Sequence, residues 1–373
     1  MYSFDASSPL HRIITTPEAL SELASRLAGQ EALGLDTEFL RERTYRAQLC
    51  LLQVAAGAEL LCVDPLALPD LAPLAPALAD RRVSKVIHAS RQDLEVLLPL
   101  TGAIHGVFDT QVAAGLAGLP PQIGYAELVR RLLGHDLPKM HTRTDWSRRP
   151  LSAEQLDYAL DDVRFLVPIA QQLGEQLDKL GRLPWLAEEL AWLDDESRFQ
   201  VEPAAAWLKI KGLGGLDPGR TRLAQELAAW RERRAIERNR PRGWILDDLV
   251  LREIVLQVPR TAAALAQVRE IPPGVVKHCG EQILAVVRAV ELPDPAPPLP
   301  ARTRPDPAKV TLVKRLVTVT QEAAAQLQLS AEVLATRRDL EKLAEGREDS
   351  AVLKGWRRGA VGERLLAALA AGS

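Results

Sequence analysis

The 373-residue sequence contains only three cysteines, and Cys50, Cys62 and Cys279 are far apart. An odd, widely spaced set offers neither a disulfide framework nor a zinc-binding pattern, so Cys50 and Cys62 are expected to be small core residues. The sequence also lacks any run of 18 apolar residues, which argues against a membrane-spanning helix. Its beginning has no basic segment followed by an apolar core, so no secretory signal is expected. These absences favour a cytoplasmic protein.

Aromatic residues are scarce, at 4%, whereas apolar residues make up 47% and charged residues 26%, as in ordinary globular proteins. The chain is longer than one hydrophobic core usually supports, which predicts two or three domains. The net charge of −2 hides an asymmetry: residues 1–200 carry 19 Lys and Arg against 28 Asp and Glu, and residues 201–373 carry 28 against 21. An acidic half joined to a basic half suits a metal-dependent catalytic domain attached to a polyanion-binding one, and chance explains it equally well.

The first 200 residues alternate between strand and helix patterns, which predicts an α/β domain with a mixed central sheet. Thr16 and Pro17 have the residue types of a helix start, and Gly57 separates two strand patterns as in a hairpin. The last element is expected to be one long helix from Ser152 to about Leu180, opened by a capping box.

Strand patterns fade after residue 200, and the remaining chain reads as short helices interrupted by a stretch with seven prolines. Such a proline-rich stretch suits a stiff, extended linker. The expected domains are an α/β domain (1–203), an all-α domain (204–292), a proline-rich linker (293–307) and a second all-α domain (308–373).

Two carboxylates, Asp36 and Glu38, stand one residue apart where a predicted buried strand ends. Side chains i and i+2 point to the same face of a strand, so these two should converge. Converging carboxylates repel each other unless a proton or a cation lies between them, and a hard ion such as Mg²⁺ or Mn²⁺ prefers oxygen ligands. The alternative is a strand that simply ends in a polar loop.

Two later segments offer further acids. Asp93 lies in the first turn of a predicted helix, where the helix dipole alone would favour it. Tyr158 and Asp162 are four residues apart and therefore share one face of the next helix, while Asp161 points elsewhere. Each segment alone is typical of an ordinary amphipathic helix; an ordered set of four acids and a tyrosine is more specific.

This set resembles the three exonuclease boxes of the DEDD superfamily, in the subclass with a tyrosine in the third box. The neighbouring sequences "DTEFLRERTY", "IHASRQDLEVL" and "TDWSRRPLSAEQLDYALDDVRFL" are similar to the ribonuclease D family, over nearly all of residues 10–200. In the middle domain, "WRERRA", "NRPRGWILDD" and "HCGEQI" resemble the HRDC module, a small helical nucleic-acid-binding domain. The resemblance implies a ribonuclease H-like exonuclease domain followed by two HRDC-like domains, the second more divergent.

The resemblance also implies a mechanism. One divalent ion (Mg²⁺ or Mn²⁺) would be held by Asp36, Glu38 and Asp162, and a second by Asp36 with help from Asp93 through water. Tyr158 would orient the attacking water. The expected activity is 3′→5′ exoribonucleolytic release of nucleoside 5′-monophosphates, with precursor tRNA 3′ ends as the substrate, by a monomer that binds RNA and no membrane.

Other residues are candidates for RNA contact. Phe39 could wedge against terminal bases, and Tyr45 could stack on them or pack at the sheet edge. The remaining candidates are His88, Arg148, Arg149, Arg233, Arg234 and Arg238. The last three belong to a stretch, 220–242, with eight arginines against three glutamates, which is either an RNA-facing surface or a solvated helix with i,i+4 ion pairs. Trp146 is expected to be a packing residue, and packing is also the alternative for His88.

Two other functions fit the same residues. A 3′→5′ DNA exonuclease would use the same acids, although this chain contains no polymerase or helicase. A catalytically silent RNA-binding adaptor is the alternative outside the enzymes, and the complete acidic set argues against it.

Overall fold

The computed structural model describes residues 12–138, 144–292 and 306–371. By their internal contacts these residues divide into two compact units. The first unit comprises the described residues within Met1–Leu40, Leu49–Phe199 and Pro305–Ser373, and the second comprises those within Arg41–Gln48 and Gln200–Arg304. Most of the predicted proline-rich linker lies outside the described residues.

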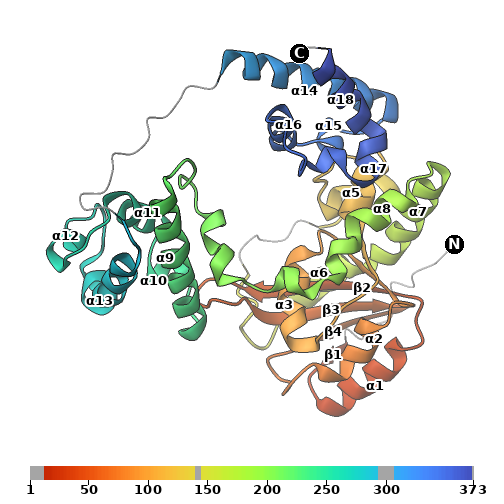
Figure 1. The fold of residues 1–373 in the computed structure, drawn as a ribbon. Helices are drawn as coiled ribbons and strands as arrows, with labels where there is room; N and C mark the ends of the chain where they lie inside the picture. Colours follow the sequence, from red (N-terminus) through yellow and green to blue (C-terminus); the bar gives the residue numbers. More distant parts are fainter. Residues whose placement is uncertain (1–11, 139–143, 293–305, 372–373) are drawn as a thin grey trace. The chain divides into compact units, whose positions relative to one another are not determined.

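A six-stranded mixed sheet lies at the centre of the first unit (Figure 1). Its strands are β1 (Arg12–Ile14), β2 (Ala32–Leu40), β3 (Gln48–Ala56), β4 (Glu59–Val63), β5 (Ser84–Ile87) and β6 (Val107–Asp109). The spatial order is β1-β4-β3-β2-β5-β6, with β1 parallel to β4, β2 and β6 parallel to β5, and β3 antiparallel to β4. The predicted mixed sheet is confirmed, as is the hairpin turn at Gly57, whose φ of 59° suits glycine.

Helices cover the sheet. They are α1 (Pro17–Leu27), α2 (Ala75–Ala79), α3 (Arg91–Thr101), α4 (Thr110–Leu116), α5 (Tyr125–Leu133), α6 (Ala153–Arg164), α7 (Leu166–Lys179) and α8 (Leu183–Leu190), with short 3-10 helices η1 (Ala72–Leu74), η2 (Ala191–Asp194) and η3 (Glu196–Phe199). The Thr16 cap and the Ser152–Gln155 capping box form as predicted. Among the described residues, no helix combines the length and apolarity needed to cross a membrane.

The predicted single helix from Ser152 to Leu180 is wrong, because the chain breaks at Phe165 between α6 and α7. Pro168 has no N–H to donate to the carbonyl four residues earlier, and its ring would crowd that carbonyl. The Tyr125 hydroxyl also enters the helical ladder: it donates to the Asp161 carbonyl (3.2 Å) and accepts from the Phe165 amide (3.2 Å). A side chain inserted between residues i and i+4 bends a helix.

The second unit is helical, as predicted. Its elements are η4 (Pro203–Lys209), α9 (Pro218–Glu237), α10 (Arg242–Ile245), α11 (Asp248–Gln257), α12 (Ala262–Ala266) and α13 (Pro273–Ala289). Apolar residues of these helices, such as Leu227, Leu251 and Ile283, are fully buried in one core. Asp217 caps α9 by accepting from the Arg220 amide (2.9 Å). This unit therefore has the small hydrophobic core of an independent module.

The C-terminal helices belong to the first unit. They are α14 (Pro307–Leu327), α15 (Ala331–Leu334), α16 (Arg337–Ala344), η5 (Ala351–Leu353), α17 (Gly355–Arg357), η6 (Arg358–Gly362) and α18 (Glu363–Ala370). Leu316 and Trp356 share one core with Leu173 of α7 and Leu186 of α8. The Trp356 ring stacks on Trp185 with centroids 4.4 Å apart, and its indole N–H donates to Glu189 (2.7 Å). The amphipathic pattern predicted helices here but could not identify their packing partner.

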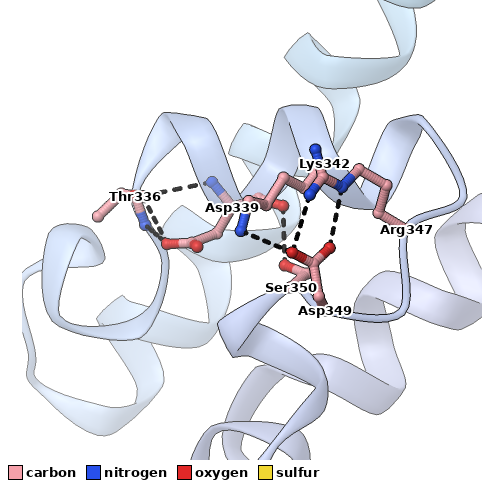
Figure 2. A network of polar contacts seen from close by, with 6 residues as sticks. All are labelled: Thr336, Asp339, Lys342, Arg347, Asp349 and Ser350. Carbon is pink, nitrogen blue, oxygen red and sulfur yellow. Dashed lines mark hydrogen bonds and ion pairs between the residues drawn. The ribbon is translucent and has the colours of Figure 1, made fainter. Parts of the chain in front are cut away.

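A polar network fixes the turn after α16, as Figure 2 shows. Thr336 and Asp339 form a capping box at the start of the helix, and the Ser350 hydroxyl donates to the Asp339 carbonyl (2.9 Å). Asp349 accepts from Lys342 (3.1 Å) and from the Arg347 guanidinium (2.9 Å). These contacts close the loop between α16 and η5 without using an apolar residue.

Candidate active site

Four carboxylates come together from three elements of the first unit. Asp36 and Glu38 lie on β2, Asp93 lies in the first turn of α3, and Asp162 lies near the end of α6. The titration of Asp36 reflects this proximity: burial raises its pKa first, and the charges of Asp93, Asp162 and Glu38 raise it further. The structure therefore brings together every acid that the sequence predicted.

Burial dominates the titration of this cluster, and like charges add to it. Burial, followed by the charges of Asp162 and Asp93, raises the pKa of Glu38 to about 8. Burial also raises the pKa of Asp162 to about 7 and that of Asp93 to about 6. No basic side chain of the described residues is among the leading causes that shift these values. At neutral pH the ion-free cluster therefore retains protons that ordinary carboxyl groups would have lost.

The close approach of α6 to β2 depends on Gly34. A Cβ at this position would lie 3.1 Å from the carbonyl oxygen of Val163 and 3.1 Å from the Cβ of Ala55. Glycine thus lets the helix that carries Asp162 approach the strand that carries Asp36.

Two sets of hydrogen bonds position Asp93: one on its own carboxylate, and one in the turn that precedes α3. The Thr37 hydroxyl, on the opposite face of β2 from Asp36, donates to the Asp93 carboxylate (2.5 Å). Asp109, at the end of β6, accepts from the Ser90 amide and hydroxyl (both 2.8 Å) and from the Ala89 amide (3.2 Å). Ala89 has a φ of 57°, an unusual conformation for a residue with a side chain, so Asp109 stabilises the turn that aims α3.

Sequence reasoning missed Asp109 and Tyr125. Asp109 also caps α4 by accepting from the Gln111 amide (2.9 Å), and its position before Thr110 in "VFDT" is the one local signal for that role. Tyr125 holds the end of α6 next to Asp162, and nothing in its own segment indicates this contact.

Tyr158 lies one turn before Asp162, and its hydroxyl hydrogen-bonds to the Asp162 carboxylate. Burial, followed by the charges of Asp162 and Glu38, raises the pKa of Tyr158 above its usual value. The phenol therefore stays protonated and acts as a hydrogen-bond donor. Trp146, which is 6% exposed, stacks on the Tyr158 ring with centroids 6.3 Å apart, which confirms the predicted packing role of Trp146.

The two neighbouring arginines near this site differ. Arg149 uses all of its donors inside the protein: it forms a bidentate pair with Asp64 (2.6 and 2.8 Å) and donates to the carbonyls of Cys50, Trp146 and Arg148. These contacts favour a structural role for Arg149 over the predicted RNA contact. The Arg148 side chain is 84% exposed and pairs with Asp145 at the surface (3.2 Å), so it is accessible to a phosphate.

His88 is also engaged within the protein. One ring nitrogen contacts the Thr110 hydroxyl (2.8 Å) and the other contacts the Ile123 carbonyl (3.0 Å). Burial lowers the pKa of His88, which favours the neutral ring. This environment favours packing over RNA contact. Phe39, next to Glu38 on β2, is partly buried and stays a candidate for contact with the terminal base.

In the second unit, the arginine-rich stretch is only partly a surface. Arg220 and Arg231 are buried and pair with Asp217 (2.8 Å) and Asp248 (2.6 Å). Arg233 and Arg238 are exposed, and Arg234 is partly buried. The interpretation of the whole stretch as one RNA-facing surface is therefore too broad, since part of it stabilises the module.

The donor set of the first unit fits divalent metal ions. In the described part of the chain, no three His, Cys, Asp or Glu side chains are already arranged as ligands of an ion. The four carboxylates nevertheless supply oxygen ligands, which hard divalent cations prefer, and a cation between them would relieve their repulsion. Asp36, Glu38, Asp93 and Asp162 are thus the residues that could hold such ions.

These pKa shifts predict the pH dependence of stability without metal. An acid with a raised pKa binds more protons in the folded state, so stability is lost as pH rises from about 4 to about 8. In EDTA, the melting temperature should fall between pH 5.5 and pH 8, and Mn²⁺ should reverse the loss. Asp36→Asn should raise the EDTA melting temperature at pH 8, because it removes one buried, repelling carboxylate from the cluster.

The matched control is Asp178→Asn, which neutralises an exposed acid on α7 and should change neither quantity. A melting temperature that rises with pH in EDTA, or an Asp36→Asn protein that behaves like the control, would contradict the proposed repulsion.

Comparisons with known proteins identify an exonuclease domain and an HRDC domain in this chain. A family model described as a 3′-5′ exonuclease matches residues 11–178, and the HRDC domain model matches residues 220–287. Ribonuclease D of Gluconacetobacter diazotrophicus is 41% identical, over 95% of this chain and 92% of that protein. Ribonuclease D of Acidiphilium cryptum is 39% identical, over 94% and 91%. The HRDC model matches one region, so the second HRDC-like domain stays a prediction.

A solved structure shows the same likeness along nearly all of the chain. The crystal structure of Escherichia coli RNase D, described as an exoribonuclease involved in structured RNA processing, has a TM-score of 0.86 at 30% identity. The match covers 97% of this chain and 99% of that one. The fold is a ribonuclease H-like exonuclease domain with a helical HRDC region, and this DEDD fold implies divalent metal ions. The chain therefore belongs to the ribonuclease D family of 3′→5′ exoribonucleases.

Proposed function

We propose that this exoribonuclease trims RNA one nucleotide at a time with two divalent ions, Mg²⁺ or Mn²⁺, and releases nucleoside 5′-monophosphates. The observation that carries the proposal is the buried convergence of Asp36, Glu38, Asp93 and Asp162, which repel one another. The proposed substrate is the 3′ end of precursor tRNA, and the enzyme acts in the cytoplasm as a monomer. The E. coli relative's described role in structured RNA processing supports this substrate class.

The acids divide into two sets of ligands. Asp36, Glu38 and Asp162 would hold one ion, and Asp36 would share the second with Asp93 through water. When bound, such ions lower the pKa of the attacking water and stabilise charge on the leaving 3′ oxygen.

Tyr158 orients the water. Its hydroxyl keeps its proton, because burial and nearby carboxylates raise its pKa, and it lies beside Asp162. A protonated phenol cannot serve as a base, but it donates a hydrogen bond that fixes the attacking oxygen.

RNA contacts come from two surfaces. In the first unit, Phe39 would meet the terminal base and Arg148 a phosphate. In the second unit, Arg233, Arg234 and Arg238 of the HRDC region would contact the phosphates of longer RNA. The predicted HRDC-like domain at 308–373 has no assigned ligand.

The central experiment uses 5′-labelled single-stranded RNA with either a free 3′ hydroxyl or a 3′ phosphate. With Mg²⁺ or Mn²⁺, the free end should shorten stepwise to give nucleoside 5′-monophosphates, and the blocked end should resist. Asp36→Asn and Asp162→Asn should abolish hydrolysis, since each removes an anionic ligand, while Asp178→Asn should leave it unchanged. Full activity in either ligand variant would overturn the two-ion assignment, and cleavage of circular RNA would identify an endonuclease.

Tyr158→Phe removes only the hydroxyl. It should lower kcat by about 10²-fold, the usual effect of losing one oriented hydrogen-bond donor, and leave KM nearly unchanged. Tyr45→Phe is the matched control, because that hydroxyl donates to Glu232 in the second unit (2.6 Å). A change confined to KM in Tyr158→Phe would show that this tyrosine binds substrate and does not orient water.

Replacing Arg233, Arg234 and Arg238 by Ala tests the second surface. Affinity for structured RNA should fall, and the slope of log K against log salt should become shallower by about 0.7 per lost single-strand phosphate contact. Arg222→Ala is the control, because this exposed arginine on the same helix pairs with Glu226 (2.7 Å). An unchanged slope in the triple variant would leave these arginines as a solvated face.

A further inference from the structure

Gln53, on the central strand β3, is a buried polar side chain without a hydrogen bond. Its exposed fraction is 0%, and both amide atoms, Oε1 and Nε2, lack a partner in the described structure. Buried amides in proteins are almost always paired, so an unpaired one calls for a specific explanation. Because no part of Gln53 reaches solvent, it cannot contact RNA directly.

The strand pairing places Gln53 next to Asp36. β2 and β3 are neighbours in the sheet, and only residues 41–47 connect them, which is too short for a parallel crossover. The two strands are therefore antiparallel. Gly34 lies beside Ala55, since a Cβ on the glycine would be 3.1 Å from the Ala55 Cβ. Two residues further along β2 and two back along β3 are Asp36 and Gln53, which thus share one face as cross-strand neighbours.

The cross-strand neighbour of Gln53 on the other side, among the described residues, is not a comparable acceptor. On its far side, Gln53 pairs in register with Cys62 of β4, a buried thiol packed against Ala159 and Leu160 of α6. The carboxylate of Asp36 is therefore the strong acceptor in this row of side chains. An amide donor next to a carboxylate ligand is the arrangement by which outer residues orient the ligands of a metal.

We propose that Gln53 is a positioning residue for Asp36: its Nε2–H₂ donates to the Asp36 carboxylate when that carboxylate turns to hold divalent ions. This assignment rests on the proposed function, because it requires that Asp36 bind the ions. The amide of Gln53 is unpaired in the described structure, so a carboxylate turned toward it would gain a donor. Being neutral, it orients the carboxylate without competing with the cations for it.

The test measures Mn²⁺ binding by the full-length protein without RNA, by titration calorimetry. Gln53→Met keeps the side chain's length and removes its polar atoms. It should weaken Mn²⁺ affinity by about 10–100-fold, the usual effect of losing such an outer contact, while the melting temperature in EDTA stays equal or rises. Activity should recover at saturating Mn²⁺. Leu51→Met, a size-conserving change two residues earlier on the same face of β3, should bind Mn²⁺ like the wild type.

Wild-type Mn²⁺ affinity in Gln53→Met would overturn the assignment. If the melting temperature in EDTA also fell, the amide of Gln53 would have a purely structural role. If Gln53→Met does not fold, Gln53→Asn tests the assignment instead, because it keeps an amide on a side chain shorter by one methylene. This variant should also weaken Mn²⁺ binding. A wild-type protein that binds no Mn²⁺ would instead overturn the proposed function itself, together with this assignment.

Discussion

Repulsion among buried carboxylates is the constraint on which the rest of the first unit depends. Burial alone opposes ionisation of Asp36, and three neighbouring acids oppose it further. Such a cluster persists only if the surrounding structure fixes its backbone. Gly34 allows α6 to approach β2, Asp109 holds the turn before α3, and Tyr125 holds the end of α6. The scaffold thus maintains an unfavourable arrangement of carboxyl groups that a divalent cation would make favourable.

The parts of the site that follow from short-range rules could be predicted from the sequence. Alternation along β2 placed Asp36 and Glu38 on one face, and helical spacing placed Tyr158 beside Asp162. The break at Phe165 was missed, although Pro168 signals it locally. The roles of Asp109 and Tyr125 depend on partners about 20 and 40 residues away in the chain, and no local pattern reports them.

Two adjacent arginines show a limit of prediction from sequence. The sequence does not distinguish Arg148 from Arg149, yet Arg148 lies at the surface, whereas Arg149 connects the loop before α6 to Asp64. Likewise, the C-terminal helices were recognisable by their apolar pattern, but their core is shared with α7 and α8. A pattern shows that a face will be buried; the surface that covers it is a tertiary property.

Two side chains that donate to the carboxylates share one chemical property, which is neutrality. Thr37 donates to Asp93 and Tyr158 donates to Asp162, and the proposed donor to Asp36, Gln53, is neutral as well. An arginine or lysine in any of these places would pair with an acid and would compete with a metal cation for its oxygens. Neutral donors orient the same oxygens and leave their charge available. RNA is itself a polyanion, so under the proposed function this cluster of acids would accept a phosphodiester only with cations bound. Neutral support around the acids would then couple RNA binding at the site to metal binding.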